Sequence, residues 1–295
     1  MTDNIFQKGC LVQLTVSKWG GVKRIDKSKL SGMVEQSGSG IDWVSATKKL
    51  VDPASLKPIC KISNAARNYL ASISLPFPIT GMVFVPKDLI SQVDHKLCSF
   101  QSKFNLAVID FTLDYNKLRN SAKGFLGGLF NEIDYPVDIG AKFNFAWRFI
   151  VLDVPNGDTT LLAPEVYERE KEKFIQTMEE ARSMAIDALR EDFAQMVERI
   201  SERFTQNGSG KSKIFKNTTV ESFYEYFQTF KERNIFKDDK LADLVDRAQS
   251  VLNGSSAEQI RTSEGLKEEI RSGMAEIENA IVEVFDRPRR KIVMD

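Results

Sequence analysis

The chain has 295 residues and a mass of 33.4 kDa, and its 41 Lys and Arg side chains are balanced by 41 Asp and Glu side chains. Hydrophobic residues make up 42% of the chain and charged residues 28%, which excludes a predominantly disordered protein. No stretch reaches the roughly 18 to 20 consecutive apolar residues that a membrane helix needs, and no basic segment followed by an apolar one stands at the start. We therefore expect a soluble, cytoplasmic protein with no membrane association.

The neutral total hides a charge difference between the two halves of the chain. Residues 1–154 hold 19 Lys and Arg against 13 Asp and Glu, and residues 155–295 hold 22 against 28. Two interpretations are open: the halves dock on each other, or each faces a partner of opposite charge. A protein that grips duplex DNA usually carries a more strongly basic domain, so nucleic-acid binding is possible but not favoured.

Three cysteines are present, and they lie about 40 to 50 residues apart in the sequence. Their odd number and wide spacing fit neither a disulfide framework nor a metal cluster. We expect Cys10, Cys60 and Cys98 to be three buried thiols.

The first half mixes strand and helix patterns. Cys10–Ser17 is short and rich in Leu, Val and Thr, which predicts a strand, and polar, glycine-rich Ser28–Gly40 predicts a surface loop. Pro53–Ser72, which follows the potential cap Asp52, is predicted to be a helix. The three prolines of Leu75–Pro86 predict an extended, buried connection that is neither a helix nor a central strand.

A long helix and a second strand complete this half. Apolar residues at steps of three and four predict a helix over Lys87–Lys123. Ala141–Val154 predicts a strand, with Phe143, Phe145 and Trp147 on one side of it. We expect this strand to pair with Cys10–Ser17, because two apolar strands need hydrogen-bonding partners.

The second half is predicted to be helical almost to its end. Glu165–Phe204 contains no Pro or Gly and predicts one helix of about 40 residues, and three further helical segments follow at Val220–Asn234, Asp238–Leu252 and Ala257–Phe285. They suggest an antiparallel hairpin or bundle with coiled-coil character, and self-association remains possible. The fold class is therefore α+β and predominantly α-helical, with a mixed α/β domain over residues 1–154 and a long-helix region over 155–295.

Gly208–Ser212 spells the end of a phosphate-binding loop, but the rest of that motif is missing. The full motif needs a glycine where this chain has Thr205, and an apolar strand in place of the charged helix that ends at Phe204. We interpret the segment as a loop that terminates a helix, in which Lys211 and Lys213 are solvated charges.

The catalytic candidates have no recognisable partners. His95 is the single histidine, whereas catalysis or zinc binding needs further ligands or a nucleophile nearby. Asp110 and Asp114 share a helix face, as solvated pairs often do. No standard signature for hydrolysis, dinucleotide binding or calcium binding occurs. We expect a protein that is not an enzyme and that has no cofactor, catalytic residue or metal site.

Two segments remain candidates for contact with an anion or nucleic acid. The aromatic residues between Phe215 and Phe236 are interleaved with lysines, which permits base stacking, but Phe223, Phe227 and Phe230 follow a helical spacing that favours a packed core. The basic tail at residues 287–291 is either frayed or a docking segment for an acidic partner or a phosphate backbone. The candidate contacts are Lys211, Lys213, Lys216, Arg289, Arg290 and Lys291.

Two blocks of sequence resemble one family. The first comprises LVQLTVSKWGGVKRI, KKLVDPASLKPICKISNAARNYLASISLPF, MVFVPKDLI and FNFAWRFIVLDV, and the second is GKSKIFKNTTVESFYEYFQTFKERNIFKDDKLADLVDRAQSVL. Together they resemble an uncharacterised domain-of-unknown-function family of bacteria, phages and integrative elements. The two blocks cover roughly two thirds of the chain, and their order is more specific than either block alone.

The resemblance implies partners rather than a reaction. Members of that family are typically encoded beside a MoxR-type AAA ATPase and a cobaltochelatase-like von Willebrand A protein. It therefore implies a non-enzymatic adaptor or scaffold of a phage or mobile element that acts with these two proteins in a bacterial host cell. The alternative is a nucleic-acid-binding accessory factor in replication or recombination. The resemblance assigns no catalytic residue.

Overall fold

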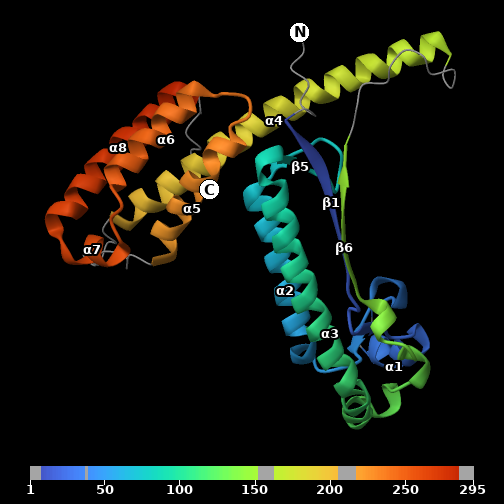
Figure 1. Ribbon diagram of the computed structural model, residues 1–295. Coiled ribbons are helices and arrows are strands. Elements are labelled where there is room, and N and C mark those ends of the chain that lie inside the picture. Colours follow the sequence, from blue (N-terminus) through green and yellow to red (C-terminus); the bar gives the residue numbers. More distant parts are fainter. Residues whose placement is uncertain (1–7, 37–38, 152–162, 205–216, 286–295) are drawn as a thin grey trace. The chain divides into compact units, whose positions relative to one another are not determined.

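The computed structural model describes residues 8–36, 39–151, 163–204 and 217–285 (Figure 1). The chain divides into two compact units: unit 1 comprises residues 1–11, 73–90 and 151–295, and unit 2 comprises residues 12–72 and 91–150. Unit 1 is thus assembled from three separate stretches, whereas the sequence suggested two contiguous domains. The boundary expected after residue 154 lies outside the described residues.

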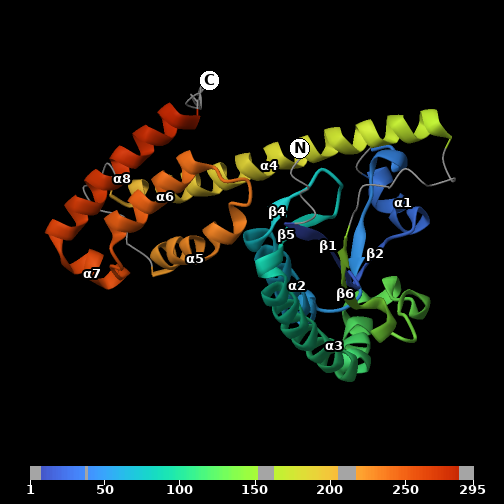
Figure 2. The same ribbon diagram turned by 45° about the horizontal axis from the view of Figure 1, so that its top comes forward.

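Unit 2 is built from a pair of neighbouring strands and two long helices. Strand β1 (Gly9–Ser17) neighbours β6 (Asn144–Ile150), so the predicted pairing of these two strands is confirmed. Helices α2 (Pro53–Ile73) and α3 (Ile90–Leu126) lie side by side in both views (Figures 1 and 2). Both helices were predicted within a few residues of these bounds. Asp52 accepts a hydrogen bond from the backbone N–H of Ala54 at 2.9 Å and so caps the start of α2.

Aromatic rings fill the space between α3 and β6. The ring of Phe104 lies 5.5 Å from that of Phe145, and the ring of Phe111 lies 5.7 Å from that of Phe143, at distances typical of favourable aromatic pairs. Gln101 donates a hydrogen bond to the carbonyl of Phe145 at 2.8 Å. The aromatic side of the predicted strand is therefore its core side, as the alternation indicated.

A small ribbon and several short helices complete unit 2. Strands β2 (Val22–Arg24) and β3 (Thr47–Lys49) pair antiparallel, with Lys23 opposite Lys48. The other elements are helix α1 (Lys27–Gln36) and the short 3₁₀ helices η2 (Ile41–Trp43), η4 (Gly127–Leu129), η5 (Glu132–Asp134) and η6 (Gly140–Lys142). The prediction of a surface loop over Ser28–Gly40 was wrong, because Leu30 and Val34 lie one helical turn apart and are both buried.

Unit 1 contains the start of β1 together with two short strands. Strand β4 (Leu75–Pro76) pairs antiparallel with β5 (Val83–Pro86), and β5 also neighbours β1. A side chain at Gly9 would lie 2.2 Å from the carbonyl oxygen of Val85, so this contact requires glycine. The expectation that Leu75–Pro86 forms no central strand was wrong: β5 has a strand on each side. Its proline is tolerated because it is the last residue of the strand.

Helices make up the rest of unit 1. The long helix α4 (Pro164–Phe204) confirms the predicted helix of about 40 residues, and it packs against β4, α5 (Asn217–Arg233) and α8 (Glu264–Phe285). Helix α8 also packs against α6 (Asp239–Leu252) and α7 (Ala257–Thr262). The prediction of one helix over Ala257–Phe285 was wrong, since α7 ends at Thr262 and the side chain of Ser263 accepts a hydrogen bond from the N–H of Leu266.

The fold class is therefore α+β and mainly helical, as predicted, whereas the coiled-coil character stays a prediction. No helix among the described residues is long and apolar enough to cross a membrane. Of the three expected buried thiols, Cys10 is buried, Cys60 is half-buried and Cys98 is exposed on α3, so that expectation was wrong for the last two. Their helices bury other positions of the turn, which the spacing of the cysteines did not indicate.

Candidate functional site

All six residues that the sequence proposed as anion or nucleic-acid contacts lie outside the described part of the chain. Lys211, Lys213 and Lys216 belong to residues 205–216, together with the glycine-rich Gly208–Ser212 segment. The three residues of the basic tail, Arg289, Arg290 and Lys291, belong to residues 286–295. Their role therefore stays a prediction.

The weak catalytic candidates are not brought together. His95 is exposed on α3, and its neighbour Asp94 accepts a hydrogen bond from the indole N–H of Trp147 at 3.0 Å. Asp110 and Asp114 are exposed on the same helix, and Asp114 forms an ion pair with Lys117 at 3.1 Å. Among the described residues, no three His, Cys, Asp or Glu side chains are grouped closely enough to hold a metal ion.

The aromatic residues of α5 belong largely to the core of unit 1. Phe223, Tyr226 and Phe230 are buried, and the ring of Tyr226 lies 5.7 Å from that of Phe230 and 6.0 Å from that of Phe193 on α4. These rings are packed between helices and are closed to a nucleic-acid base. The packed-face interpretation of their helical spacing is therefore confirmed for these residues, and the base-stacking interpretation loses its support here.

Next to this aromatic core, a buried arginine joins three segments of unit 1. Arg233 donates hydrogen bonds to the carboxylate of Asp192 at 2.9 Å and to the carbonyl of Ser74 at 3.4 Å. Its guanidinium lies 5.9 Å from the ring centroid of Tyr226, whose hydroxyl donates to the carbonyl of Leu189 at 3.1 Å. Burial raises the pKa of Tyr226, and the guanidinium opposes that rise only in part. These contacts fasten α4, α5 and the segment before β4 together.

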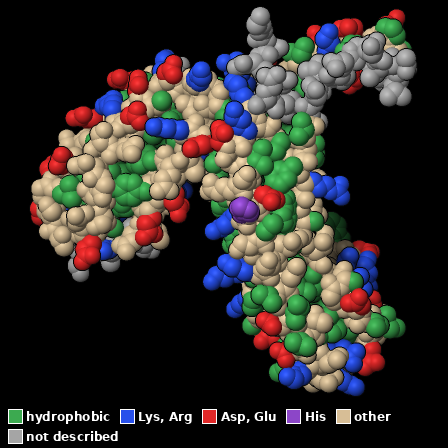
Figure 3. Space-filling view, viewed as in Figure 1, with side chains coloured by type: hydrophobic (Ala, Val, Ile, Leu, Met, Phe, Trp, Pro, Cys, Tyr) green, Lys and Arg blue, Asp and Glu red, His purple; other side chains and the backbone are tan. Residues whose placement is uncertain are grey.

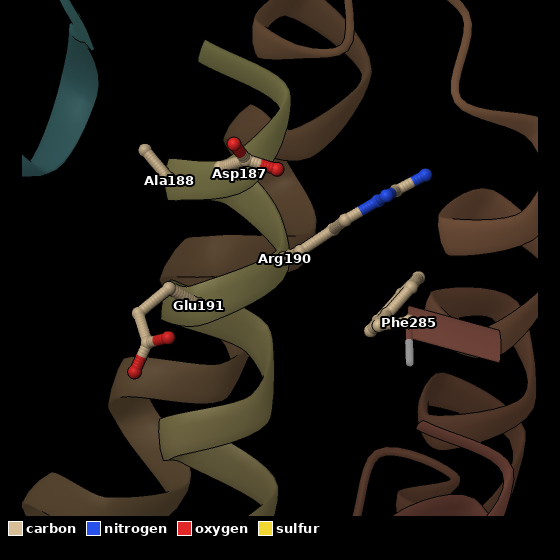
Figure 4. Close-up of a pocket in the computed structure, with 5 residues that line it drawn as sticks. All are labelled: Asp187, Ala188, Arg190, Glu191 and Phe285. Carbon is tan, nitrogen blue, oxygen red and sulfur yellow. The ribbon is translucent and has the colours of Figure 1, made fainter. Parts of the chain in front are cut away.

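A second arginine lines a shallow hollow of about 440 Å³ on the surface of unit 1 (Figure 4). Arg190 extends toward Phe285, whose ring centre is 4.7 Å from the guanidinium, whereas Glu191 points away from that ring. Arg190 also forms an ion pair with Asp238 at 2.7 Å. The charged groups that line the hollow are Asp187, Arg190 and Glu191, and a nucleophile is not among them. The arrangement suits contact with another molecule better than catalysis.

Unit 2 contains a buried ion pair that sequence reasoning missed. Lys48 forms an ion pair with Asp134 at 2.6 Å and donates a second hydrogen bond to the carbonyl of Leu129, also at 2.6 Å. The hydroxyl of Tyr135 donates to the carbonyl of Leu50 at 2.8 Å. These bonds attach the β2–β3 ribbon to the segment after α3. Lys48 and Asp134 are 86 positions apart, and nothing in the local pattern of either residue links them.

The most distinctive surface of unit 2 is an apolar strip on α3. Leu106, Ile109 and Leu113 are 62%, 54% and 76% exposed, and at 3.6 residues per turn they lie on one side of the helix. This side is opposite the one buried through Phe104 and Phe111. Scattered exposed apolar residues are ordinary, but neighbouring ones mark contact sites. The sequence analysis assigned α3 only its core-facing stripe and missed this second one. We call these three residues the α3 apolar strip.

Comparisons with known proteins give one match. The family model described as a protein of unknown function, DUF3150, matches residues 6–206. No curated protein and no solved structure matches the sequence.

Proposed function

The chain belongs to the DUF3150 family, and from its surfaces we propose that it is a non-enzymatic adaptor or scaffold that binds other proteins. Following the resemblance described above, its partners are a MoxR-type AAA ATPase and a cobaltochelatase-like von Willebrand A protein. It acts in the cytoplasm of a bacterial host on behalf of a phage or mobile element.

The α3 apolar strip is the observation that carries this proposal. The helix already buries its opposite side in unit 2, so its position does not depend on a partner. A preformed helix with exposed aliphatic side chains one and two turns apart can enter a hydrophobic groove of another protein. Burying the exposed parts of the three side chains would contribute on the order of 4 kcal/mol before the costs of association.

The test is co-purification of the tagged full-length protein from its native host at moderate salt, with and without nuclease. We expect an AAA ATPase and a von Willebrand A-like protein in both samples. Changing Ile109 and Leu113 to Glu should reduce their recovery at least tenfold, because a charge on the strip must be desolvated on docking. Recovery of replication or recombination proteins alone, lost on nuclease treatment, would contradict the proposal.

A matched control is available in the same unit. Ile133 and Val137 are also highly exposed, but they lie outside α3. The double change of Ile133 and Val137 to Glu adds the same charge and removes similar side chains. We expect it to leave the recovery of both partners unchanged, and an equal loss from the two double variants would show that the strip is not the contact.

A further inference from the structure

The positive charge of this protein is concentrated in unit 2. Its residues 12–72 and 91–150 contain 17 Lys and Arg and 10 Asp and Glu, whereas unit 1 contains 24 and 31. Division by structure gives a sharper separation than division at the middle of the sequence, because the stretches 1–11 and 73–90 leave the basic group. Unit 2 therefore carries a formal charge of about +7, which acts on any charged partner.

Helix α2 contributes a face without any acidic side chain. Its 21 residues contain Lys57, Lys61 and Arg67 and no Asp or Glu. Lys57, Lys61, Asn64 and Asn68 are exposed at spacings of four, three and four, which places them along one side of the helix. The buried side of α2, through Leu56, Ile59, Ser63, Ala66 and Leu70, lies opposite. The exposed side thus offers ammonium and carboxamide donors in one row.

Helix α3 extends this face. Lys96 lies 5.7 Å from the ring centroid of Tyr69 on α2 and 5.9 Å from that of Phe100, so it stands over the junction of the two helices. Lys103 is exposed two turns further along α3. Figure 3 shows Lys and Arg side chains along the side of unit 2 that α2 and α3 form. We call Lys57, Lys61, Lys96 and Lys103 the α2–α3 basic face.

The charges of this face are not neutralised by the protein. Among the described residues, none of the four lysines forms an ion pair, unlike Lys27, Lys48 and Lys117 of the same unit. Asp94 on α3 is turned to Trp147, and Asp110 is the acidic residue that continues the line of Lys96 and Lys103. Arg67 donates to Ser63 and to the carbonyl of Val16, so it faces the strand.

We propose that the α2–α3 basic face binds the phosphate backbone of a nucleic acid. Phosphate contacts need unpaired Lys or Arg together with amide donors such as Asn, and the face supplies both. Lysines one helical turn apart are spaced closely enough to contact successive phosphates of a strand. This site differs from the six candidate contacts of the sequence analysis, and it leaves the α3 apolar strip free for a protein.

The test is fluorescence anisotropy of the full-length protein with labelled single-stranded and duplex DNA of equal length. Four phosphate contacts predict a slope of about −3.6 for log K against log salt on duplex, and so a loss of about 100-fold between 50 and 200 mM salt. The two DNA arms identify which form the face prefers. No binding to either form at 50 mM salt would overturn the proposal.

Variants locate the contact. Changing Lys57 and Lys61 to Glu should weaken binding at least tenfold and lower the slope by about 2, since each phosphate contact adds about 1 to it. Changing Lys142 and Arg148 to Glu makes the same change of net charge at exposed positions of unit 2 that lack an ion pair among the described residues. This control should retain binding, and equal loss in both variants would overturn the proposal.

Two further variants and a competitor distinguish a phosphate contact on α2 from misfolding, from a site elsewhere in the chain and from an acidic protein partner. The milder change of Lys57 and Lys61 to Gln, with an unchanged circular dichroism spectrum, separates lost contact from misfolding and should still weaken binding. A variant with Lys211 and Lys213 changed to Glu should bind as the unaltered protein does, and loss of binding only in that variant would move the site away from α2. Displacement of DNA by polyglutamate at equal charge would indicate an acidic protein partner and overturn the proposal.

Discussion

Both units contain a buried ion pair, but the two pairs are buried in different ways. In unit 2 the side chains of Lys48 and Asp134 are 9% and 10% exposed, whereas in unit 1 those of Arg233 and Asp192 are 3% and 46% exposed. A charge that loses its partner costs free energy according to how well water reaches it. In unit 2 either partner is costly to leave alone, whereas in unit 1 only the arginine is.

The largest effect is expected from Asp134→Ala in unit 2. It leaves the Lys48 ammonium buried with only the carbonyl of Leu129 as a partner. We expect the free energy of unfolding to fall by about 3 kcal/mol, measured by urea denaturation. Asp114→Ala removes an exposed ion pair and should change it by less than about 0.5 kcal/mol. Equal effects of the two substitutions would contradict the importance of burial.

In unit 1 the two partners should differ from each other. Asp192→Ala leaves the buried guanidinium of Arg233 with the carbonyl of Ser74, and we expect a loss of about 2 kcal/mol. Arg233→Met leaves a half-exposed carboxylate that water can solvate, and it keeps most of the side-chain volume, so about 1 kcal/mol is expected. Urea denaturation of both variants checks the order, and the reverse order would show that volume matters more than charge.

A smaller loss is expected at the hollow of unit 1. Arg190→Ala removes the ion pair with Asp238 and the stacking on Phe285, and we expect about 1 kcal/mol. Asp238 keeps its hydrogen bond from the N–H of Leu241, which limits the cost. Lys267→Ala, which removes an exposed ion pair with Glu264, serves as the control and should be nearly neutral. The thermal unfolding midpoint of each variant provides the measurement.

The pH dependence of stability gives the smallest effect near neutral pH. Burial raises the pKa of Tyr226, so the folded protein keeps this proton while the unfolded chain loses it above about pH 10. The contribution is fully present below that pH and decreases as the pH rises beyond it. Between pH 9 and 11 we expect Tyr226→Phe to lose about 1 kcal/mol less than the unaltered protein. Parallel curves from urea titrations would contradict this assignment.

The sequence predicted the elements that depend on local pattern. The long helices and the strand over Ala141–Val154 follow from apolar spacing, and Phe145 faces the core as its alternation indicated. Helix α1 was missed because the buried pair Leu30 and Val34 is surrounded by Gly and Ser. Strand β5 was missed because the prolines of its segment hid the three residues that can join a sheet.

The contacts that fasten each unit could not be read from the sequence. Lys48 and Asp134 look like ordinary surface residues until β3 brings them together, and Arg233 resembles the basic end of an amphipathic helix. The basic face of α2 was readable in principle, because Pro53–Ile73 lacks Asp and Glu, but only the structure shows that Lys57 and Lys61 are exposed together.

The discontinuity of unit 1 has a consequence for synthesis on the ribosome. Every residue of unit 2 has been made once Ile150 is added, so that unit can fold while α5 to α8 are still being translated. Strands β4 and β5 are made early, but the residues that cover Leu75, Phe77 and Phe84, which include Ala181, Ala185 and Phe236, come more than 90 positions later. Until then, these apolar side chains of the nascent chain stay uncovered and are natural binding sites for a chaperone.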